Sequence, residues 1–373
     1  MRVASFRASL ASFSFHTRFY AAGKPGVPRA GFKAHGDIGD GRNDQQQLQS
    51  ANPYKSREHM NHKWLILMCV GCLAGGSAAG HLTEVDETAL KPPFKKSDVL
   101  SNISKTFEFR PDLAAMGVRV AFLLAARRAG LTTDSFDESC AVARGLEDIA
   151  GVFQQLGTMY HISTEDAASL VAVAALKFLK APSESIENAW RWGRNDTDEA
   201  PPRRRRNDEK FPVEASGVQS LLKGLCDLTD AECVALLACH SVGEFHEHVS
   251  GLDGATHIGS RYKLSNEYYK FLLSNEKRFF DLEVPRTEEN KEIRRLPKNF
   301  VCVYASTGKR GKKKQCVFNR SEVDAILKNS TWRKLAEYYA ENEAAWAEAF
   351  QSGFTKMIDS NFKRLRPYDA STD

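Results

Sequence analysis

The sequence lacks a concentration of charge of one sign. It carries 52 Lys and Arg against 47 Asp and Glu, a net charge of +5. A nucleic-acid-binding domain would gather a basic excess on one face. Here the excess lies in the N-terminal tail and in the runs Arg203–Arg206 and Lys309–Lys314, which are typical of solvated loops. We therefore expect no nucleic-acid partner.

The sequence also lacks a regular cysteine framework. Its eight cysteines are scattered, and no cluster has the spacing of a zinc site. Cys69 and Cys72 have the C-x-x-C spacing but stand inside an apolar stretch, where we interpret the spacing as incidental. Cysteine usage therefore indicates neither a disulfide scaffold nor a zinc module, and it leaves the redox compartment open.

The first 60 residues lack any helical or strand period and predict a disordered tail, residues 1–60. Residues 1–30 hold five basic side chains and no acid, which resembles a mitochondrial presequence. The same stretch could instead lie upstream of the real start of the protein, at Met60.

Long uncharged runs are rare in this chain, and one is notable. Residues 64–80 contain no charge. The length of this run, 17 residues, is at the lower limit for a membrane span and also fits a signal peptide. Basic residues before the run favour a cytoplasmic N-terminal side. We predict that residues 61–81 form a signal anchor, or alternatively a cleaved signal peptide. The expected location is a single-pass membrane protein of the endoplasmic reticulum or secretory pathway, with the mitochondrion as the alternative.

From about residue 91 to residue 366 the chain predicts a mainly α domain. Apolar periodicity and helix-start residues mark its helices. The predicted helices cover Asp112–Arg128, Cys140–Leu156, Ser163–Leu179, Val218–Leu225, Thr229–His240, Asn266–Leu273 and Ser321–Phe362. Two short apolar runs around a basic, glycine-bearing loop predict a small β-hairpin over Phe300–Phe318.

The segment Leu228–His246 carries the strongest functional signal. A capped apolar helix ends at His240, and a glycine and a second histidine follow three and six residues later. Taken alone, His240 would be a buried core histidine. With the downstream motifs Ser250–Gly254 and Leu264–Tyr269 and the upstream Trp192–Asp196, the order resembles class I heme peroxidases, over roughly residues 95–365.

That resemblance implies a fold and a cofactor. Two helical subdomains would sandwich heme b, with His240 as the proximal iron ligand and with His246 and Ser250 holding the heme propionates. In this family a buried aspartate orients the proximal histidine. The alignment puts Val323 at that position, so either Glu322 or Asp324 could serve, and the sequence leaves the choice open.

The distal machinery of the family is incomplete. The segment Met116–Arg128 resembles the distal helix: Arg119 keeps the arginine, while Phe122 and Leu123 replace tryptophan and histidine. The distal histidine of the family acts as general base and then as general acid, and such catalysis typically contributes about 10²–10⁴-fold to the rate. Arginine stays protonated and cannot replace it as the base. We therefore expect little activity with hydrogen peroxide. Ala255-Thr256 replaces the tryptophan that cytochrome c peroxidase oxidises, so cytochrome c is not expected as an electron donor by that route.

Cys140 is a candidate distal iron ligand. It aligns with the region of a distal asparagine of the family, in the first turn of a predicted helix, where exposed N–H groups favour a thiolate. The alternative is a small buried apolar cysteine. Ligation by both His240 and Cys140 would resemble a kinetoplastid-type pseudoperoxidase.

Three functions follow from this resemblance. The expected function is decomposition of peroxynitrite or another small oxidant by a heme-binding pseudoperoxidase in oxidative-stress defence. The first alternative is a heme-based redox or gas sensor switched by displacement of Cys140. The second is a heme-free interaction module.

Overall fold

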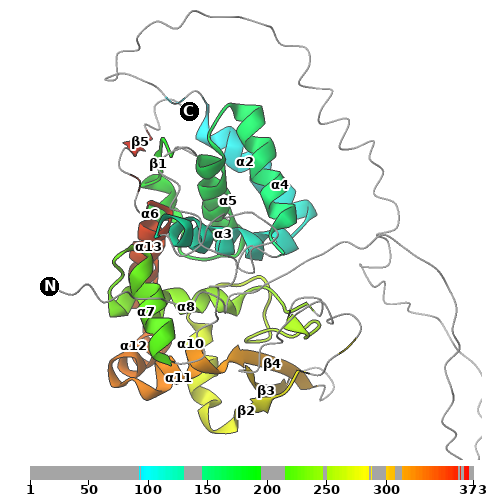
Figure 1. The fold of residues 1–373 in the computed structure, drawn as a ribbon, viewed down its shortest axis with the longest axis vertical. Coiled ribbons are helices and arrows are strands. Elements are labelled where there is room, and N and C mark those ends of the chain that lie inside the picture. Colours follow the sequence, from blue (N-terminus) through cyan, green and yellow to red (C-terminus); the bar gives the residue numbers. More distant parts are fainter. Residues whose placement is uncertain are drawn as a thin grey trace, which may run out of the picture. The chain divides into compact units, whose positions relative to one another are not determined.

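Two groups of helices build the described part of the chain (Figure 1). The computed structural model describes residues 92, 94–129, 145–194, 215–246, 250–284, 287, 300–306, 313–359, 362 and 365–368, all of which belong to one unit. The first group holds α2 (Lys96–Phe109), α3 (Asp112–Arg128), α4 (Glu147–Tyr160), α5 (Thr164–Phe178) and the short α6 (Glu184–Asn188).

The second group holds α7 (Ala215–Cys226), α8 (Asp230–Leu237), α10 (Glu267–Ser274), α11 (Arg320–Lys328) and α12 (Ser330–Glu341). The 3₁₀ turn η2 (Ala238–Ser241) continues α8, and η3 (Glu276–Arg278) follows α10. The long α13 (Glu343–Asp359) packs against α3 of the first group and α8 of the second. This mainly helical architecture agrees with the fold class expected from the sequence.

A small antiparallel sheet belongs to the second group. The predicted hairpin is confirmed as β3 (Phe300–Ser306) and β4 (Lys313–Asn319), with Val303 opposite Cys316. A third strand, β2 (Phe280–Leu282), pairs with β3 and was not predicted, because three residues carry too little periodicity. A separate two-stranded sheet joins β1 (Arg191–Trp192) to β5 (Arg366–Pro367).

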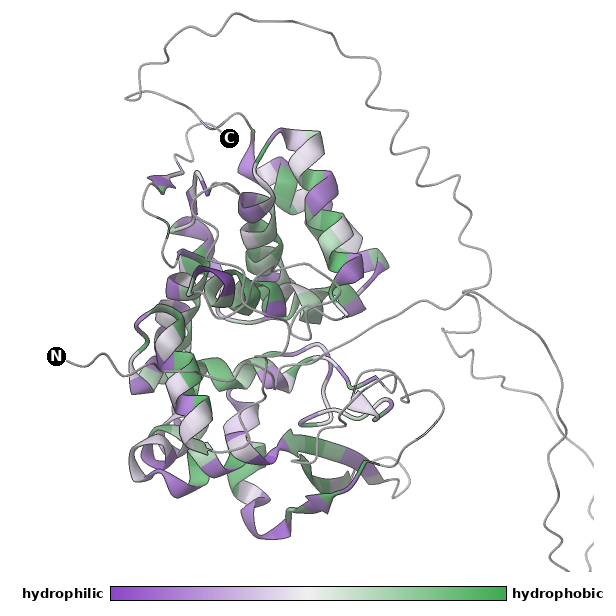
Figure 2. Cartoon of the chain, in the orientation of Figure 1, coloured by the Kyte–Doolittle hydropathy of each residue, from purple (hydrophilic) through white to green (hydrophobic). Residues whose placement is uncertain are grey.

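Helix α3 is the central helix of the first group, and its bounds match the predicted helix. Every side chain from Leu113 to Ala126 is buried, and Figure 2 colours most of the helix as hydrophobic. It packs closely on α5 at Gly117, where a Cβ atom would lie 2.8 Å from the Cβ of Ala175. Two apolar faces with small residues at the crossing explain why these helices approach so closely.

Helix α4 begins later than predicted. Residues 147–160 are helical, but Gly145 has φ +82°, a left-handed conformation that a continuous helix does not contain. The prediction of one helix from Cys140 to Leu156 is therefore wrong at its start. Cys140 itself lies outside the described residues.

Arg194 joins the end of the first group to the end of α13. Its side chain has no exposed surface and donates to Asp166 at 2.9 Å and to Asp359 at 2.6 Å. Its Nε also donates to the carbonyl of Ile358 at 3.0 Å. This guanidinium therefore links the start of α5 to the last turn of α13. The same turn of α13 carries Met357, which lines the pocket described below.

Within the described ranges, no helix is both long and apolar enough to cross a bilayer. The predicted tail and the predicted membrane segment, residues 1–60 and 61–81, lie outside the described residues. Both stay predictions.

Candidate functional site

His240 lies in η2, directly after α8. Helix α8 starts where the sequence predicts: the Thr229 hydroxyl accepts from the backbone N–H of Glu232, and Glu232 accepts from the backbone of Thr229, which is a capping box. Glu232 also accepts hydrogen bonds from Ser352 and Lys356 of α13. These contacts fix the helix that presents His240, whose side chain is 3% exposed.

Glu322 of α11 is the acid that holds His240. Its Oε1 lies 2.8 Å from Nδ1 of the ring, and its side chain is 2% exposed. A carboxylate oxygen accepts, so Nδ1–H is the donor, and in the neutral form of the ring Nε2 is the nitrogen with the free lone pair. Asp324 instead pairs with the exposed Lys328. Tertiary structure thus selects Glu322 over Asp324, a choice that the sequence left open.

Two further side chains contact Glu322. The hydroxyl of Tyr268, on α10, donates to Oε1, the same oxygen that accepts from His240. The amide of Asn319 lies 3.5 Å from Oε2. The carboxylate therefore sits among buried donors rather than in water.

His257 is a site residue that the sequence reasoning missed. Its ring stacks on that of His240, with centroids 5.0 Å apart and an interplanar angle of 7°. Burial, and then the neighbouring His240, lower the pKa of His257 well below 6.5, so it is neutral at physiological pH. In the sequence, His257 directly follows Ala255-Thr256, the pair that replaces the tryptophan. The general signal was a histidine shortly after a glycine turn, which is too weak by itself to mark a site.

His240, His257 and Glu322 lie close enough to suggest a direct metal site, since one potential ligand atom of each falls within 4.8 Å of the others. Imidazole nitrogens bind a metal along the ring plane. Because the two rings are nearly parallel and stacked, one ion cannot lie in both planes. The geometry therefore favours a single metal-binding histidine with a stacked neighbour.

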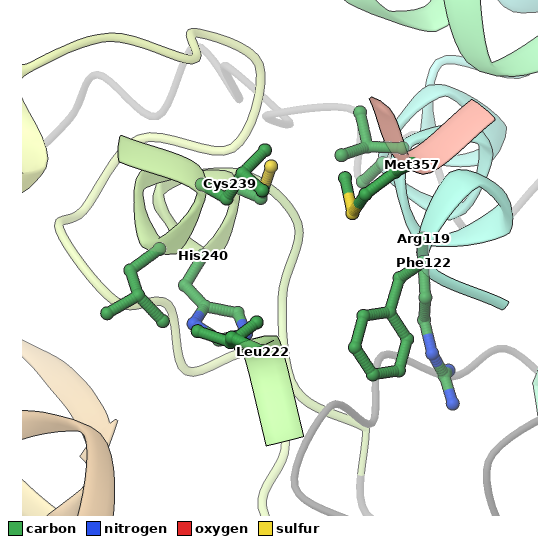
Figure 3. A pocket seen from close by; sticks show the side chains of 10 residues that line it. Arg119, Phe122, Leu222, Cys239, His240 and Met357 are labelled. Atoms are coloured by element: carbon green, nitrogen blue, oxygen red, sulfur yellow. The ribbon is translucent and has the colours of Figure 1, made fainter. Parts of the chain in front are cut away.

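A pocket lies beside His240, with α3 on its opposite wall (Figure 3). It has an empty volume of about 520 Å³, which includes space open to solvent. Its lining is mostly apolar and comes from α3, α7, α8, η2 and α13: Ala115, Val118, Arg119, Phe122, Leu222, Leu236, Leu237, Cys239, His240 and Met357. The two helix groups thus both contribute to one cavity.

Two of the three distal candidates on α3 line this pocket, and the third does not. Arg119 and Phe122 are on its wall, both nearly buried, within a stripe of α3 that also includes Ala115 and Val118. Leu123 is fully buried but is not among the lining residues. The lining thus follows the i, i+3, i+4, i+7 stripe of α3, and the leucine that replaces the distal histidine lies outside that stripe.

The remaining candidates lie away from the lining. Ser250 is buried, and its hydroxyl donates to the carbonyl of His246 at 2.9 Å, so it closes a turn of the chain. Neither Ser250 nor His246 is among the pocket-lining residues. Cys239 lines the pocket and was not singled out; burial raises the pKa of its thiol to about 12, so it is protonated at neutral pH.

Known structures identify the fold. The chain is similar to the crystal structure of a Leishmania major pseudoperoxidase, at 52% identity and a TM-score of 0.66, covering 75% of this chain and 98% of that one. The chain belongs to the heme peroxidase superfamily. No family model matches it.

Curated members of the superfamily are more distant. A Yarrowia lipolytica protein, provisionally named a heme-binding peroxidase, is 28% identical over 204 residues, 53% of this chain and 58% of that protein. The mitochondrial cytochrome c peroxidase of Candida glabrata is 24% identical over 218 residues, 58% of this chain and 53% of that protein. The chain thus spans somewhat over half the length of the curated relatives it matches.

Proposed function

We propose that this chain binds heme b in the pocket beside His240 and decomposes a small oxidant, peroxynitrite, with little activity toward hydrogen peroxide. The observation that carries the proposal is that His240, which is hydrogen-bonded to Glu322, lines an apolar pocket together with Arg119. Similarity to a pseudoperoxidase supports it.

The residues present fit heme. Because Glu322 occupies Nδ1, the ring offers Nε2 as a ligand, and such a carboxylate–histidine pair is the usual support for a metal-binding imidazole. The apolar lining suits a macrocycle. When bound, heme would supply a redox-active iron, which His240 would hold through Nε2.

The chain's own residues favour an anionic oxidant. Arg119 is the charged side chain among the described lining residues, and it would attract peroxynitrite and stabilise negative charge. Among those residues, neither a carboxylate nor a second histidine is present to move a proton between the oxygens of hydrogen peroxide. Isomerisation of peroxynitrite to nitrate balances without a reductant and needs no such transfer.

Cys140 stays a candidate sixth ligand, outside the described residues. A thiolate at that position would hold the iron and would block the access of an oxidant. We therefore propose that it acts as a labile cap and that Cys140→Ala speeds peroxynitrite decay.

Heme binding is tested first. The full chain is reconstituted with hemin, passed through a desalting column and examined by absorption spectroscopy. Wild type and His161→Asn, a control at the exposed C-terminus of α4, should keep a Soret band, while His240→Ala should lose it or shift it strongly. A colourless wild type would refute the proposal and favour a heme-free interaction module.

Activity is tested next, on the reconstituted protein. Stopped-flow decay of peroxynitrite should accelerate with wild type and slow at least tenfold with Arg119→Leu. Lys177→Met, which removes an exposed cation that is not among the pocket-lining residues, is the control. Oxidation of a phenolic donor by hydrogen peroxide should be about 10²–10⁴-fold slower than with an ordinary peroxidase. Brisk peroxide turnover, or no effect on peroxynitrite, would contradict the assignment.

A further inference from the structure

One oxygen of Glu322 serves two donors. Oε1 accepts from Nδ1 of His240 at 2.8 Å and also from the hydroxyl of Tyr268. All three side chains are buried, so water does not compete for this oxygen. The two hydrogen bonds therefore compete directly with each other.

Such sharing has an electronic consequence. A carboxylate oxygen that accepts from a phenol has less negative charge available for a second donor, and in a low-dielectric interior this redistribution is poorly screened. Tyr268 keeps its proton, because burial and then Glu322 raise its pKa well above 10. It is thus a permanent donor, and it limits how strongly Glu322 can pull on the Nδ1 proton of His240.

The adjacent tyrosine has a different task. Tyr269 is equally buried, but its hydroxyl donates to the carbonyls of Val234 at 2.6 Å and Ala235 at 3.1 Å. It therefore supports the backbone of α8 and does not touch the carboxylate. Of these two neighbouring buried tyrosines, Tyr269 thus supports the helix, and Tyr268 contacts Glu322.

We propose that Tyr268 is a positioning residue that sets how much electron density His240 passes to the iron, by sharing the oxygen of Glu322. The proposal rests on the proposed binding of heme to His240. Its consequence is directional: without the phenol, Glu322 pulls harder on Nδ1–H, the imidazole becomes a stronger donor, and the ferric state is stabilised.

The test compares Tyr268→Phe with Tyr269→Phe, which removes a hydroxyl of the same size one residue away. Spectroelectrochemical titration of the reconstituted full chain should give Tyr268→Phe a more negative ferric/ferrous midpoint potential. We expect about a tenfold change in the one-electron equilibrium, or ~59 mV. The iron–histidine stretch of the ferrous protein should move to higher frequency in the same variant. Tyr269→Phe should keep both values.

A second measurement needs no heme. In the proton NMR spectrum of the apo-protein, the hydrogen-bonded Nδ1–H of His240 should appear far downfield and be absent in His240→Ala. Tyr268→Phe should move it further downfield, whereas Tyr269→Phe should not. Unchanged spectra and potentials in Tyr268→Phe, or equal shifts in Tyr269→Phe, would overturn the proposal. A protein that binds no heme would refute the proposed function while the apo spectrum still decides the role of Tyr268.

Discussion

Replacing Arg194 with methionine should destabilise the fold strongly. The guanidinium has no exposed surface and pairs with Asp166 and Asp359. Its loss removes the cation of Asp166 and leaves Asp359 with the more distant, exposed Arg191 at 3.9 Å. Breaking a buried ion pair on one side typically costs about 3–5 kcal/mol. For a domain of this size about 2–4 °C of Tm is lost per kcal/mol, which predicts a decrease of ~6–20 °C.

The assay is urea unfolding followed by far-UV circular dichroism, with Lys177→Met as the matched control. Lys177 also pairs with a carboxylate, that of Glu187, but it is 65% exposed, and such pairs contribute about 0–1 kcal/mol. Arg194→Lys should fall between the two, because an ammonium keeps the charge but cannot engage both aspartates as the planar fork does.

The pH dependence gives a second check on Arg194. Burial raises the pKa of Asp359, and Arg194 opposes that rise. Without Arg194 the folded pKa climbs further above the unfolded value, so the folded variant binds more protons and its stability recovers as the pH falls. The deficit relative to wild type should therefore be smaller at pH 5.5 than at pH 8. A cost below ~1 kcal/mol, or a pH-independent one, would refute the reasoning that buried carboxylates lose their partner.

Three further outcomes are expected. Glu322→Gln should weaken heme retention, measured by transfer to excess apomyoglobin, by about 10–100-fold, whereas Asp324→Asn should leave it unchanged; equal effects would contradict the assignment of Glu322. Gly117→Ala should lower the free energy of unfolding by about 1–3 kcal/mol, because its Cβ would meet Ala175 at 2.8 Å; a neutral result would mean that α3 and α5 separate easily. Burial raises the pKa of Glu232, but the hydrogen bonds described above outweigh it and lower the pKa to about 2. Its contribution to stability is thus complete above pH 4.5 and is lost as the pH falls toward 2, and Tm measured from pH 7 to 3 should fall less steeply in Glu232→Gln.

Local sequence signals were sufficient for much of the helical framework. The bounds of α3 follow from an apolar run broken by Arg119, and the starts of α5 and α8 follow from the cap residues Ser163 and Thr229. Each of these signals acts within one or two turns of the chain, where hydrogen bonds to orphan N–H groups and side-chain periodicity decide the outcome. The start of α4 escaped this reasoning, because a left-handed glycine such as Gly145 is not marked by periodicity.

The site depended on contacts between distant segments. The sequence by itself determined His240 and Arg119 as candidates, because each stands in an ordered set of motifs. Only the tertiary structure decided between Glu322 and Asp324: the two positions lie about 200° apart around α11, so only one of them can face inward, and the packing of α11 decides which. It alone brought His257 onto the ring of His240 and Tyr268 onto the carboxylate. The physical reason is range: capping and periodicity act between neighbours in the chain, whereas stacking and shared hydrogen bonds require packed surfaces whose register is set by the whole core.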